Sequence, residues 1–464
     1  MRIRFSVVAC WIALAVSTPP LPGKERVDIL VTGGTVVTLD GTRRVLEDGA
    51  VAVRGERIVM VGPTAQVAET YQGKRTIDAR GKIVLPGLVN THNHAPMTLL
   101  RGIADDLALM EWLQKYIFPA EAKNVTGDFV EKGTALACLE MIRSGTTTYA
   151  DMYYFEDRVA EATFRAGMRG VLGETVLQFP SPDSRTPEEA LAYTEKYIKR
   201  WKGNHLITPV VAPHAPYTNT AETLKACKAL ADRYGVPLTI HVSETRDEVR
   251  QISEKYNTTS IKWLDGLGVL GPNVFVNHGV WLTEEDLAIV RKRGAGVTHN
   301  PESNMKLASG TAPVPRMLAL GIPVGLGTDG AASNNNLDMF EVMDFAAKLH
   351  KLVTMDPAAL PAATVLELAT LGGARVLGFD REIGSLEAGK KADLILVDAD
   401  SAHGQPLYNV YSQLVYSLKG ADVSASIIDG KVVMLDRRVL TLDEKRILED
   451  ARDMRKRVLA SLGR

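Results

Sequence analysis

The stretch Leu85-Pro-Gly-Leu-Val-Asn-Thr-His-Asn-His94 runs from an apolar segment through a Pro-Gly pair into two histidines. Residues i and i+2 of an extended backbone point to the same side, so the rings of His92 and His94 can reach one metal ion. A His-x-His pair alone is common in sequences. Its position directly after an apolar run of strand length is what makes it a candidate metal site.

The same pattern, an apolar run of strand length, recurs along the middle of the chain. The runs lie at 83–89, 146–152, 170–177, 207–212, 237–242, 274–277, 296–299 and 324–328. Amphipathic helical stretches such as 187–201, 221–233 and 284–293 separate them. Eight strands that alternate with helices over about 290 residues predict an α/β fold, a (β/α)8 TIM barrel, with a doubly wound parallel sheet as the alternative.

Polar side chains stand at the carboxyl ends of these runs, and their placement favours the barrel. Five of the nine histidines and one aspartate lie at or just beyond a predicted strand end: His92, His94, His214, His241, His278 and Asp329. His299 ends the seventh run and is a further candidate. Barrel enzymes place their active sites at the face where all eight carboxyl ends converge.

Four of these residues form a candidate metal site. His92, His94, His241 and Asp329 supply three ring nitrogens and one carboxylate, although each one alone could be an ordinary buried polar residue. Such a set suits one divalent ion and leaves room for a water molecule. The sequence therefore predicts Zn²⁺, with Fe²⁺ as the alternative.

Two further residues are candidates for proton transfer. Glu244 follows His241 by three residues, and His278 ends an apolar strand beside a glycine. A nearby cation should keep Asp329 ionised and leave His278 as a proton carrier, a further metal ligand or a hydrogen-bond partner. Metal-assisted hydrolysis would need Glu244 to move protons close to the attacking water.

Both ends of the chain have a different sequence pattern, in which short stretches of alternating apolar residues are separated by glycine turns. They lie at 28–34, 49–55 and 57–62, and again at 392–398 and 423–434. This pattern predicts one small β-sandwich domain built from segments 24–82 and 380–464 around a barrel at 83–379. A charge-rich last helix is expected at 443–462, on the surface.

Residues 1–23 have the pattern of a secretory signal peptide. Arg2 and Arg4 precede an apolar run at 5–16, and the small-residue break Ser17-Thr-Pro-Pro20 follows it. This pattern predicts a periplasmic or secreted protein. If the segment is instead a misassigned start or a loose apolar arm, the protein is cytoplasmic.

Composition excludes several classes of protein. The 464 residues carry a formal net charge of −1, so no basic excess is present to neutralise nucleic-acid phosphates. Three cysteines cannot form a disulfide scaffold. No apolar run approaches the ~18 residues of a membrane-spanning helix.

From residue 28 to about 434 the chain resembles the amidohydrolase superfamily. Pro86-Gly-Leu-Val-Asn-Thr-His-Asn-His94 matches the signature of its first strand, and Gly384-Ser-Leu-Glu-Ala-Gly389 with 392–398 matches its return into the sheet domain. Within the superfamily, the chain is similar to 5-methylthioadenosine/S-adenosylhomocysteine deaminases and their chlorohydrolase relatives. The segments that carry this similarity are 95–102, 118–121, 212–217 and 300–310.

The resemblance implies a role for each matching residue. His92, His94, His241 and Asp329 would hold one metal ion. Glu244 would transfer protons, His278 would orient the attacking water, Glu121 would bind ribose hydroxyls, and His214 would contact the substrate. Binuclear relatives need a bridging lysine at the end of the fourth strand, which this chain lacks, although Glu174 could also bridge.

The substrate implied by the resemblance is an adenosine-like nucleoside: 5-methylthioadenosine, adenosine or S-adenosylhomocysteine. Glu174 stands where some homocysteine-accepting members carry an arginine, and Arg185 is a candidate replacement cation. The alternatives are a triazine hydrolase, a guanine-type deaminase, or a non-catalytic barrel that serves in assembly. The sequence is compatible with a homo-oligomer.

Overall fold

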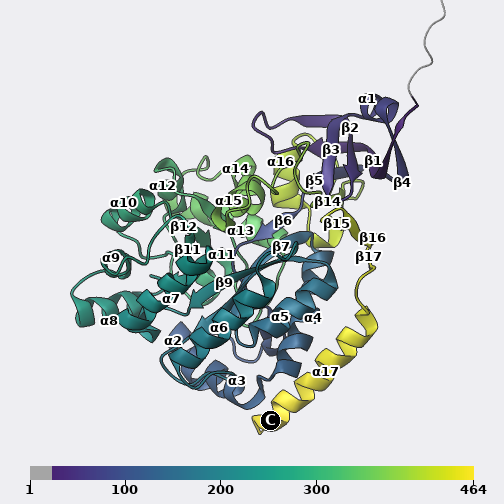
Figure 1. The fold of residues 1–464 in the computed structure, drawn as a ribbon. Coiled ribbons are helices and arrows are strands. Elements are labelled where there is room, and N and C mark those ends of the chain that lie inside the picture. The colour runs from purple at the N-terminus through teal and green to yellow at the C-terminus, as the bar shows by residue number, and fades with distance from the viewer. Residues whose placement is uncertain (1–22, 464) are drawn as a thin grey trace, which may run out of the picture.

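The computed structural model describes residues 23–463 of the chain. Residues 1–22 of the predicted signal peptide lie outside this range. Within the described residues, no helix is both long and apolar enough to cross a membrane. The structure comprises a barrel in the middle of the chain and a sheet built from both of its ends (Figure 1).

Eight parallel strands form the barrel and confirm the predicted fold class. They are β6 (Leu88–Asn90), β7 (Thr146–Tyr153), β8 (Arg169–Val176), β9 (Ile207–Pro213), β10 (Leu238–Val242), β11 (Val274–His278), β12 (Gly296–His299) and β13 (Val324–Leu326). Their spatial order follows the chain order from β6 to β13. The Thr91 amide donates to Leu326 O at 2.9 Å and the Asp329 amide to His92 O at 3.0 Å, so the last strand meets the first.

Helices surround the barrel and separate its strands along the chain (Figure 1). The α-helices are α1 (Thr64–Thr70), α2 (Leu109–Trp112), α3 (Phe118–Asn124), α4 (Gly127–Arg143), α5 (Glu156–Ala166), α6 (Pro187–Trp201), α7 (Ala221–Tyr234), α8 (Arg246–Tyr256), α9 (Ser260–Gly266), α10 (Glu284–Arg293), α11 (Pro301–Lys306), α12 (Val314–Ala319), α13 (Met339–Thr354), α14 (Ala362–Glu367), α15 (Gly373–Leu377), α16 (Val410–Ser412) and α17 (Glu444–Ser461). Short 3₁₀ or π segments are η1 (Ala95–Leu100), η2 (Leu113–Ile117), η3 (Pro216–Thr218), η4 (Leu368–Gly372), η5 (Gln413–Ser417) and η6 (Gly420–Asp422). The charge-rich α17 is the predicted last helix, and it buries only Ile447, Met454 and Val458.

The two ends of the chain join in one small β domain, as the sequence predicts, and its strands form one mixed sheet. Its strands are β1 (Glu25–Val37), β2 (Val45–Arg54), β3 (Arg57–Pro63), β4 (Tyr71–Asp78), β5 (Lys82–Pro86), β14 (Leu394–Asp398), β15 (Val423–Ile428), β16 (Lys431–Leu435) and β17 (Arg438–Val439). Strand β5 pairs with β1 on one side and antiparallel with β14 on the other, which joins the two terminal segments. Figure 1 shows these purple and yellow strands side by side at one end of the barrel.

The expected first barrel strand, 83–89, is divided in the structure. Lys82–Pro86 belongs to the terminal sheet, and only Leu88–Asn90 enters the barrel. Proline lacks an amide hydrogen, so Pro86 cannot continue the ladder as a donor. Gly87 lies so close to Thr147 that a Cβ atom would stand 2.1 Å from its Oγ1. The boundary between sheet and barrel therefore lies at Gly87, after the predicted boundary at 82/83.

A buried arginine connects the barrel to the terminal sheet. Arg169 begins β8, and its guanidinium donates to Asp393 at 2.8 and 3.2 Å and to Asp429 at 3.2 Å. The side chains of all three residues are at most 6% exposed. Because both carboxylates are buried, their loss of hydration is offset by this arginine, together with Lys391 at 3.2 Å from Asp429.

We expect Arg169→Met to lower the free energy of unfolding by about 3–5 kcal/mol, because it leaves buried carboxylates without their main partner. Urea unfolding of the purified protein measures this change. Arg158→Met is the control, since Arg158 is 53% exposed and its ion pairs should contribute less than about 1 kcal/mol. Equal losses in the two variants would contradict a connecting role for Arg169.

Candidate active site

A cavity lies at the carboxyl ends of the barrel strands. Its lining includes His94, Glu121, His214, His241, Glu244, His278 and Asp329. These residues come from separate parts of the chain, and the barrel brings them to one face. His92 lies beside the cavity, with its ring 4.9 Å from the rings of both His94 and His241.

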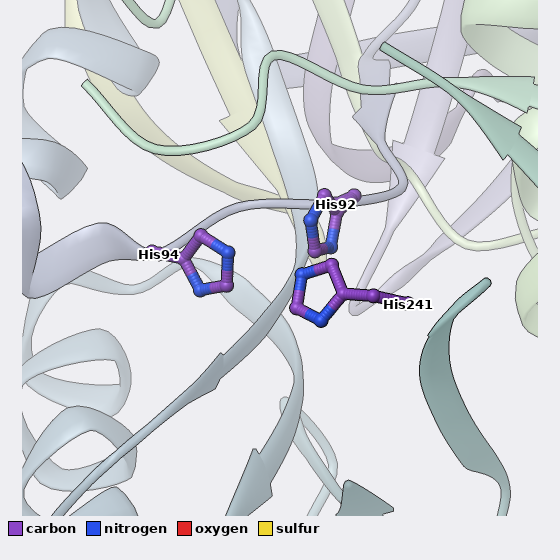
Figure 2. A group of neighbouring side chains, drawn as sticks. All are labelled: His92, His94 and His241. Atoms are coloured by element: carbon purple, nitrogen blue, oxygen red, sulfur yellow. The ribbon is translucent and has the colours of Figure 1, made fainter. Parts of the chain in front are cut away.

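His92, His94 and His241 present their ring nitrogens to one another (Figure 2). The atoms available for ligation lie within 4.8 Å of one another. Nδ1 of His94 donates to Met152 O and Nδ1 of His241 donates to His214 O, both at 2.7 Å. A backbone carbonyl only accepts, so each Nδ1 carries the proton and each Nε2 keeps its lone pair for a metal ion.

The residues present fit a divalent metal ion. His92 Nε2 is buried and has no hydrogen-bond partner among the described residues, which is costly unless a ligand fills the position. Asp329 Oδ1 lies 3.4 Å from this nitrogen and 3.3 Å from His94 Nε2. Burial lowers the pKa of His92 to about 3, so the ring is neutral and able to ligate at pH 7.

The aspartate is held in place from two sides. Its Oδ2 accepts from Ser303 Oγ at 2.6 Å, and its Oδ1 accepts from the Gly330 amide at 2.7 Å. Its φ of 62° lies in the left-handed region, which is uncommon outside glycine but tolerated best by Asp and Asn. Although burial opposes ionisation, the neighbouring His92, His278 and His94 hold the pKa of Asp329 well below its usual value.

Glu244 and His278 both line the cavity, and their side chains lie close together. Glu244 Oε2 lies 3.7 Å from His278 Nε2, and both side chains are buried. Burial, and then the nearby Asp329 charge, raise the pKa of Glu244 well above its ordinary value. On the far side of its ring, His278 Nδ1 lies 3.0 Å from Asn304 Oδ1. The pair is thus an oriented imidazole beside a carboxyl group that can hold a proton.

Glu121 lines the cavity from α3. The segment from Leu109 to Asn124 is helical throughout, because α2, η2 and α3 follow one another without a break. Glu121 is 5% exposed, and Tyr153 Oη donates to its Oε1 at 2.6 Å. Burial raises the pKa of Glu121 to about 7. The carboxyl group to which the family resemblance assigns ribose binding therefore lines the cavity.

His214 also lines the cavity, beside the histidine cluster. Its ring centroid lies 4.9 Å from that of His241, and its Nδ1 lies 3.1 Å from Thr218 Oγ1. Burial, together with the neighbouring histidines, lowers the pKa of His214 to about 3. A neutral imidazole at this place can accept or donate one hydrogen bond.

The structure does not bring Arg185 to the cavity. Arg185 is exposed in the loop before α6, and its backbone amide donates to Glu189 Oε2 at 2.8 Å. The side chain is outside the set that lines the cavity. Arg185 is thus a solvent-exposed residue before a helix, and the structure gives it no contact with the candidate active site.

Glu174 and His299 also lie away from the metal site. Glu174 accepts from the Glu156 amide at 3.0 Å on the helix side of β8, whereas its neighbour Thr175 lines the cavity. His299 Nε2 lies 3.1 Å from His350 Nε2, on α13. Alternation along a strand sends the side chains of Glu174 and Thr175 to opposite faces. Among the described residues there are two groups of candidate ligands, His92 with His94 and His241, and His92 with His278 and Asp329, and neither Glu174 nor His299 belongs to them.

Two residues in or beside the site were not among those predicted from the sequence. Tyr153 ends β7, so the rule that polar residues at strand ends form the site could have found it. Glu248 accepts from the backbone amides of Ser243 and Glu244, at 2.7 and 2.9 Å. The spacing Thr245-x-x-Glu248 is a helix-capping signal and could have drawn attention to it.

Comparison with known proteins agrees with this geometry. A model of the Amidohydrolase family matches residues 83–433. The 5-methylthioadenosine/S-adenosylhomocysteine deaminase of Syntrophobacter fumaroxidans is 52% identical over 430 residues, which cover 93% of this chain and 98% of that protein. The 5'-deoxyadenosine deaminase of Methanosarcina mazei is 46% identical over 439 residues, or 94% of this chain and 99% of that protein.

A solved structure is also similar. The crystal structure of an adenosine deaminase from Xanthomonas campestris with bound Zn superposes with a TM-score of 0.93 at 40% identity. The match covers 94% of this chain and all of that chain.

Proposed function

The chain belongs to the amidohydrolase family, and from that premise we propose that it deaminates an adenosine-type nucleoside by metal-dependent hydrolysis, releasing ammonia. It is thus a hydrolase of carbon–nitrogen bonds in a cyclic amidine. The observation that carries the proposal is the convergence of three neutral histidines, one aspartate and a buried proton-carrying glutamate on one cavity. Relatives 46–52% identical bear the names of nucleoside deaminases.

One divalent ion fits the site, and we propose Zn²⁺, which the similar Xanthomonas structure contains. His92, His94, His241 and Asp329 would hold it. When bound, such an ion lowers the pKa of a coordinated water and so supplies a nucleophile at neutral pH. Ser303 and the Nδ1–H donors described above fix the directions of the ligand side chains.

The residues around the site account for the proton transfers. Water adds to the ring carbon that bears the amino group, and His278 lies where it can orient that water. Glu244 takes a first proton from the water and passes it to the ring nitrogen. It then takes the second proton from the hydroxyl group formed on the ring carbon and passes it to the leaving amine. The products are ammonia and the inosine-type ring. Burial raises the pKa of Glu244 well above its ordinary value, which suits a carboxyl group that holds a proton between two transfers.

Glu121 and His214 would recognise the nucleoside. A buried carboxylate can accept hydrogen bonds from two ribose hydroxyls, each contributing on the order of 1.5–3 kcal/mol. Tyr153 occupies one oxygen of Glu121 and helps to fix its orientation. His214, on the same wall of the cavity, would donate to or accept from the purine ring.

We further propose that the 5' substituent is neutral. No lysine or arginine of residues 23–463 lines the cavity. The helical segment that carries Glu121 also presents Trp112, Leu113 and Phe118 to it. The carboxylate of a homocysteine group would lose hydration there without gaining a lysine or arginine as its ionic partner. This favours methylthio and deoxy substituents over the homocysteine group of S-adenosylhomocysteine.

Ammonia release from a panel of substrates tests the assignment. 5-Methylthioadenosine and 5'-deoxyadenosine are expected to be the better substrates, ahead of S-adenosylhomocysteine and far ahead of free adenine and triazines. Glu121→Ala should reduce kcat/KM for nucleosides by about 10–100-fold for each charge-assisted hydrogen bond that it removes, and should leave metal content unchanged. Free bases or triazines that react as fast as nucleosides would contradict nucleoside deamination and favour a different hydrolase. Rapid turnover of S-adenosylhomocysteine would contradict the proposal of a neutral 5' substituent but not nucleoside deamination.

Export is a separate proposal, which rests on the sequence of residues 1–23. Protein purified from its native host should begin between about Ala15 and Lys24, because a signal peptidase cleaves near a small-residue break. N-terminal sequencing or mass spectrometry of each cellular fraction measures this. An intact Met1 on cytosolic protein would contradict export and favour a cytoplasmic enzyme.

A further inference from the structure

A second buried glutamate lies directly behind Glu244. Glu248 is in the first turn of α8 and is 3% exposed. Its Oε1 accepts from the Ser243 amide at 2.7 Å and from Ser260 Oγ at 2.9 Å, and its Oε2 accepts from the Glu244 amide at 2.9 Å. We infer that Glu248 is a positioning residue for Glu244: its carboxylate fixes the backbone turn from which the Glu244 side chain enters the cavity. This inference rests on the proposed function, in which Glu244 transfers protons.

The backbone of this turn needs an acceptor. Ser243 has a φ of 53°, in the left-handed region that non-glycine residues adopt only when their surroundings fix it. The successive amides of Ser243 and Glu244 donate to the two oxygens of one carboxyl group, as backbone amides do in an anion-binding turn. The opposite side of the turn is also held, because the Trp281 amide donates to Ser243 O at 3.0 Å. The Glu248 carboxyl group therefore supplies the acceptors that the strained turn requires.

A neighbouring helix shows what ordinary capping looks like in this chain. At the start of α10, Asp286 accepts from the backbone amide of Thr283, the residue that caps the helix, at 2.9 Å. At the start of α8 the spacing is the same, and Thr245 Oγ1 accepts from the Glu248 amide at 3.2 Å. The Glu248 carboxylate, however, reaches past Thr245 to the two preceding amides. The Glu248 side chain therefore connects α8 to the turn at Ser243 and Glu244, instead of accepting from the amide of its own capping residue, Thr245.

A neutral amide cannot replace this carboxylate. Three donors face Glu248, and glutamine would turn an N–H group toward at least one of them. The turn would then shift or open, and Glu244 would move relative to the reacting atoms. Misplacement of a reacting group by about 1 Å can lower a rate by about 10²-fold.

The test compares Glu248→Gln with Asp286→Asn in the zinc-loaded enzyme. Glu248→Gln is expected to lower kcat by about 10–100-fold while zinc content and KM for 5-methylthioadenosine stay within about threefold of the wild type. Asp286→Asn removes a comparable cap and should change only thermal stability, with kcat retained. A folded, zinc-loaded Glu248→Gln enzyme with wild-type kcat would overturn the inference, as would an equal loss of kcat in Asp286→Asn.

A double-mutant cycle isolates the route through Glu244. If Glu248 acts only by placing that side chain, adding Glu248→Gln to Glu244→Gln should cause no further loss of kcat. A second loss of the same size in the Glu244→Gln background would show that Glu248 acts elsewhere and would refute the inference. Glu248→Asp keeps the charge but is too short to meet both amides, so its kcat should lie between wild type and Glu248→Gln; it replaces the glutamine variant if that does not fold. A wild-type enzyme inactive on every nucleoside would instead refute the proposed function.

Discussion

Glu244→Gln is expected to keep its bound zinc and to lose turnover by about 10²–10⁴-fold, the range typical of a general acid–base group. The substitution preserves the size and hydrogen-bonding shape of the side chain but removes its capacity to carry a proton. Deamination needs that capacity twice, once at the ring nitrogen and once at the leaving amine. The effect should fall on kcat rather than on KM, because the proton is transferred in the transition state.

Metal analysis and single-substrate kinetics check this expectation together. Glu244 approaches His278 to 3.7 Å but belongs to neither group of candidate ligands among the described residues. Zinc content should therefore match that of the wild type. Loss of the metal on substitution would make Glu244 a ligand and would require a different proton carrier.

Removal of a metal ligand should have the second large effect. His92→Ala deletes the buried Nε2 that lies in both candidate ligand groups and has no hydrogen-bond partner among the described side chains. We expect one zinc ion per wild-type chain, almost none in this variant, and ammonia release at background level. Chelation of the wild type should reproduce the loss, and added zinc should reverse it.

His299→Ala is the matched control for His92→Ala. His299 is equally buried and also ends a barrel strand, but it contacts His350 instead of the cavity. This variant should lose stability through the cavity that it creates and keep both zinc and turnover. Two zinc ions per wild-type chain at full occupancy would contradict the mononuclear site, and retention of zinc by His92→Ala would contradict the assigned ligands.

Much of the site could be predicted because barrel topology gathers residues that stand at strand ends. That rule places His92, His94, His241, His278 and Asp329 together, and the structure does so. The rule is less informative about which face of a strand a residue occupies. Glu174 and Thr175 are neighbours on β8, yet only Thr175 faces the cavity, because the pleat sends them to opposite sides.

Other features depend on backbone geometry that residue types do not reveal. The division of 83–89 at Gly87 arises from the close approach of Thr147, a tertiary contact. The route of the Glu248 carboxylate depends on the positive φ of Ser243, a residue type that seldom adopts it. Arg185 carries the right charge for a substrate carboxylate, but its loop directs it into solvent.

The continuity of β5 with β6 has a consequence for dissecting the protein. The two strands are separated by Gly87 alone, and two residues after β6 comes His92, the first of the proposed metal ligands. An excised barrel that began at residue 83 would keep every ligand but lose β1 and β14, the two neighbours of β5 in the sheet. Because β5 would then have no neighbouring strand, the start of the excised chain would be disordered, and we expect that disorder to extend to His92 and His94. The terminal sheet is thus the anchor of the metal-binding strand, so the two parts cannot be treated as exchangeable modules.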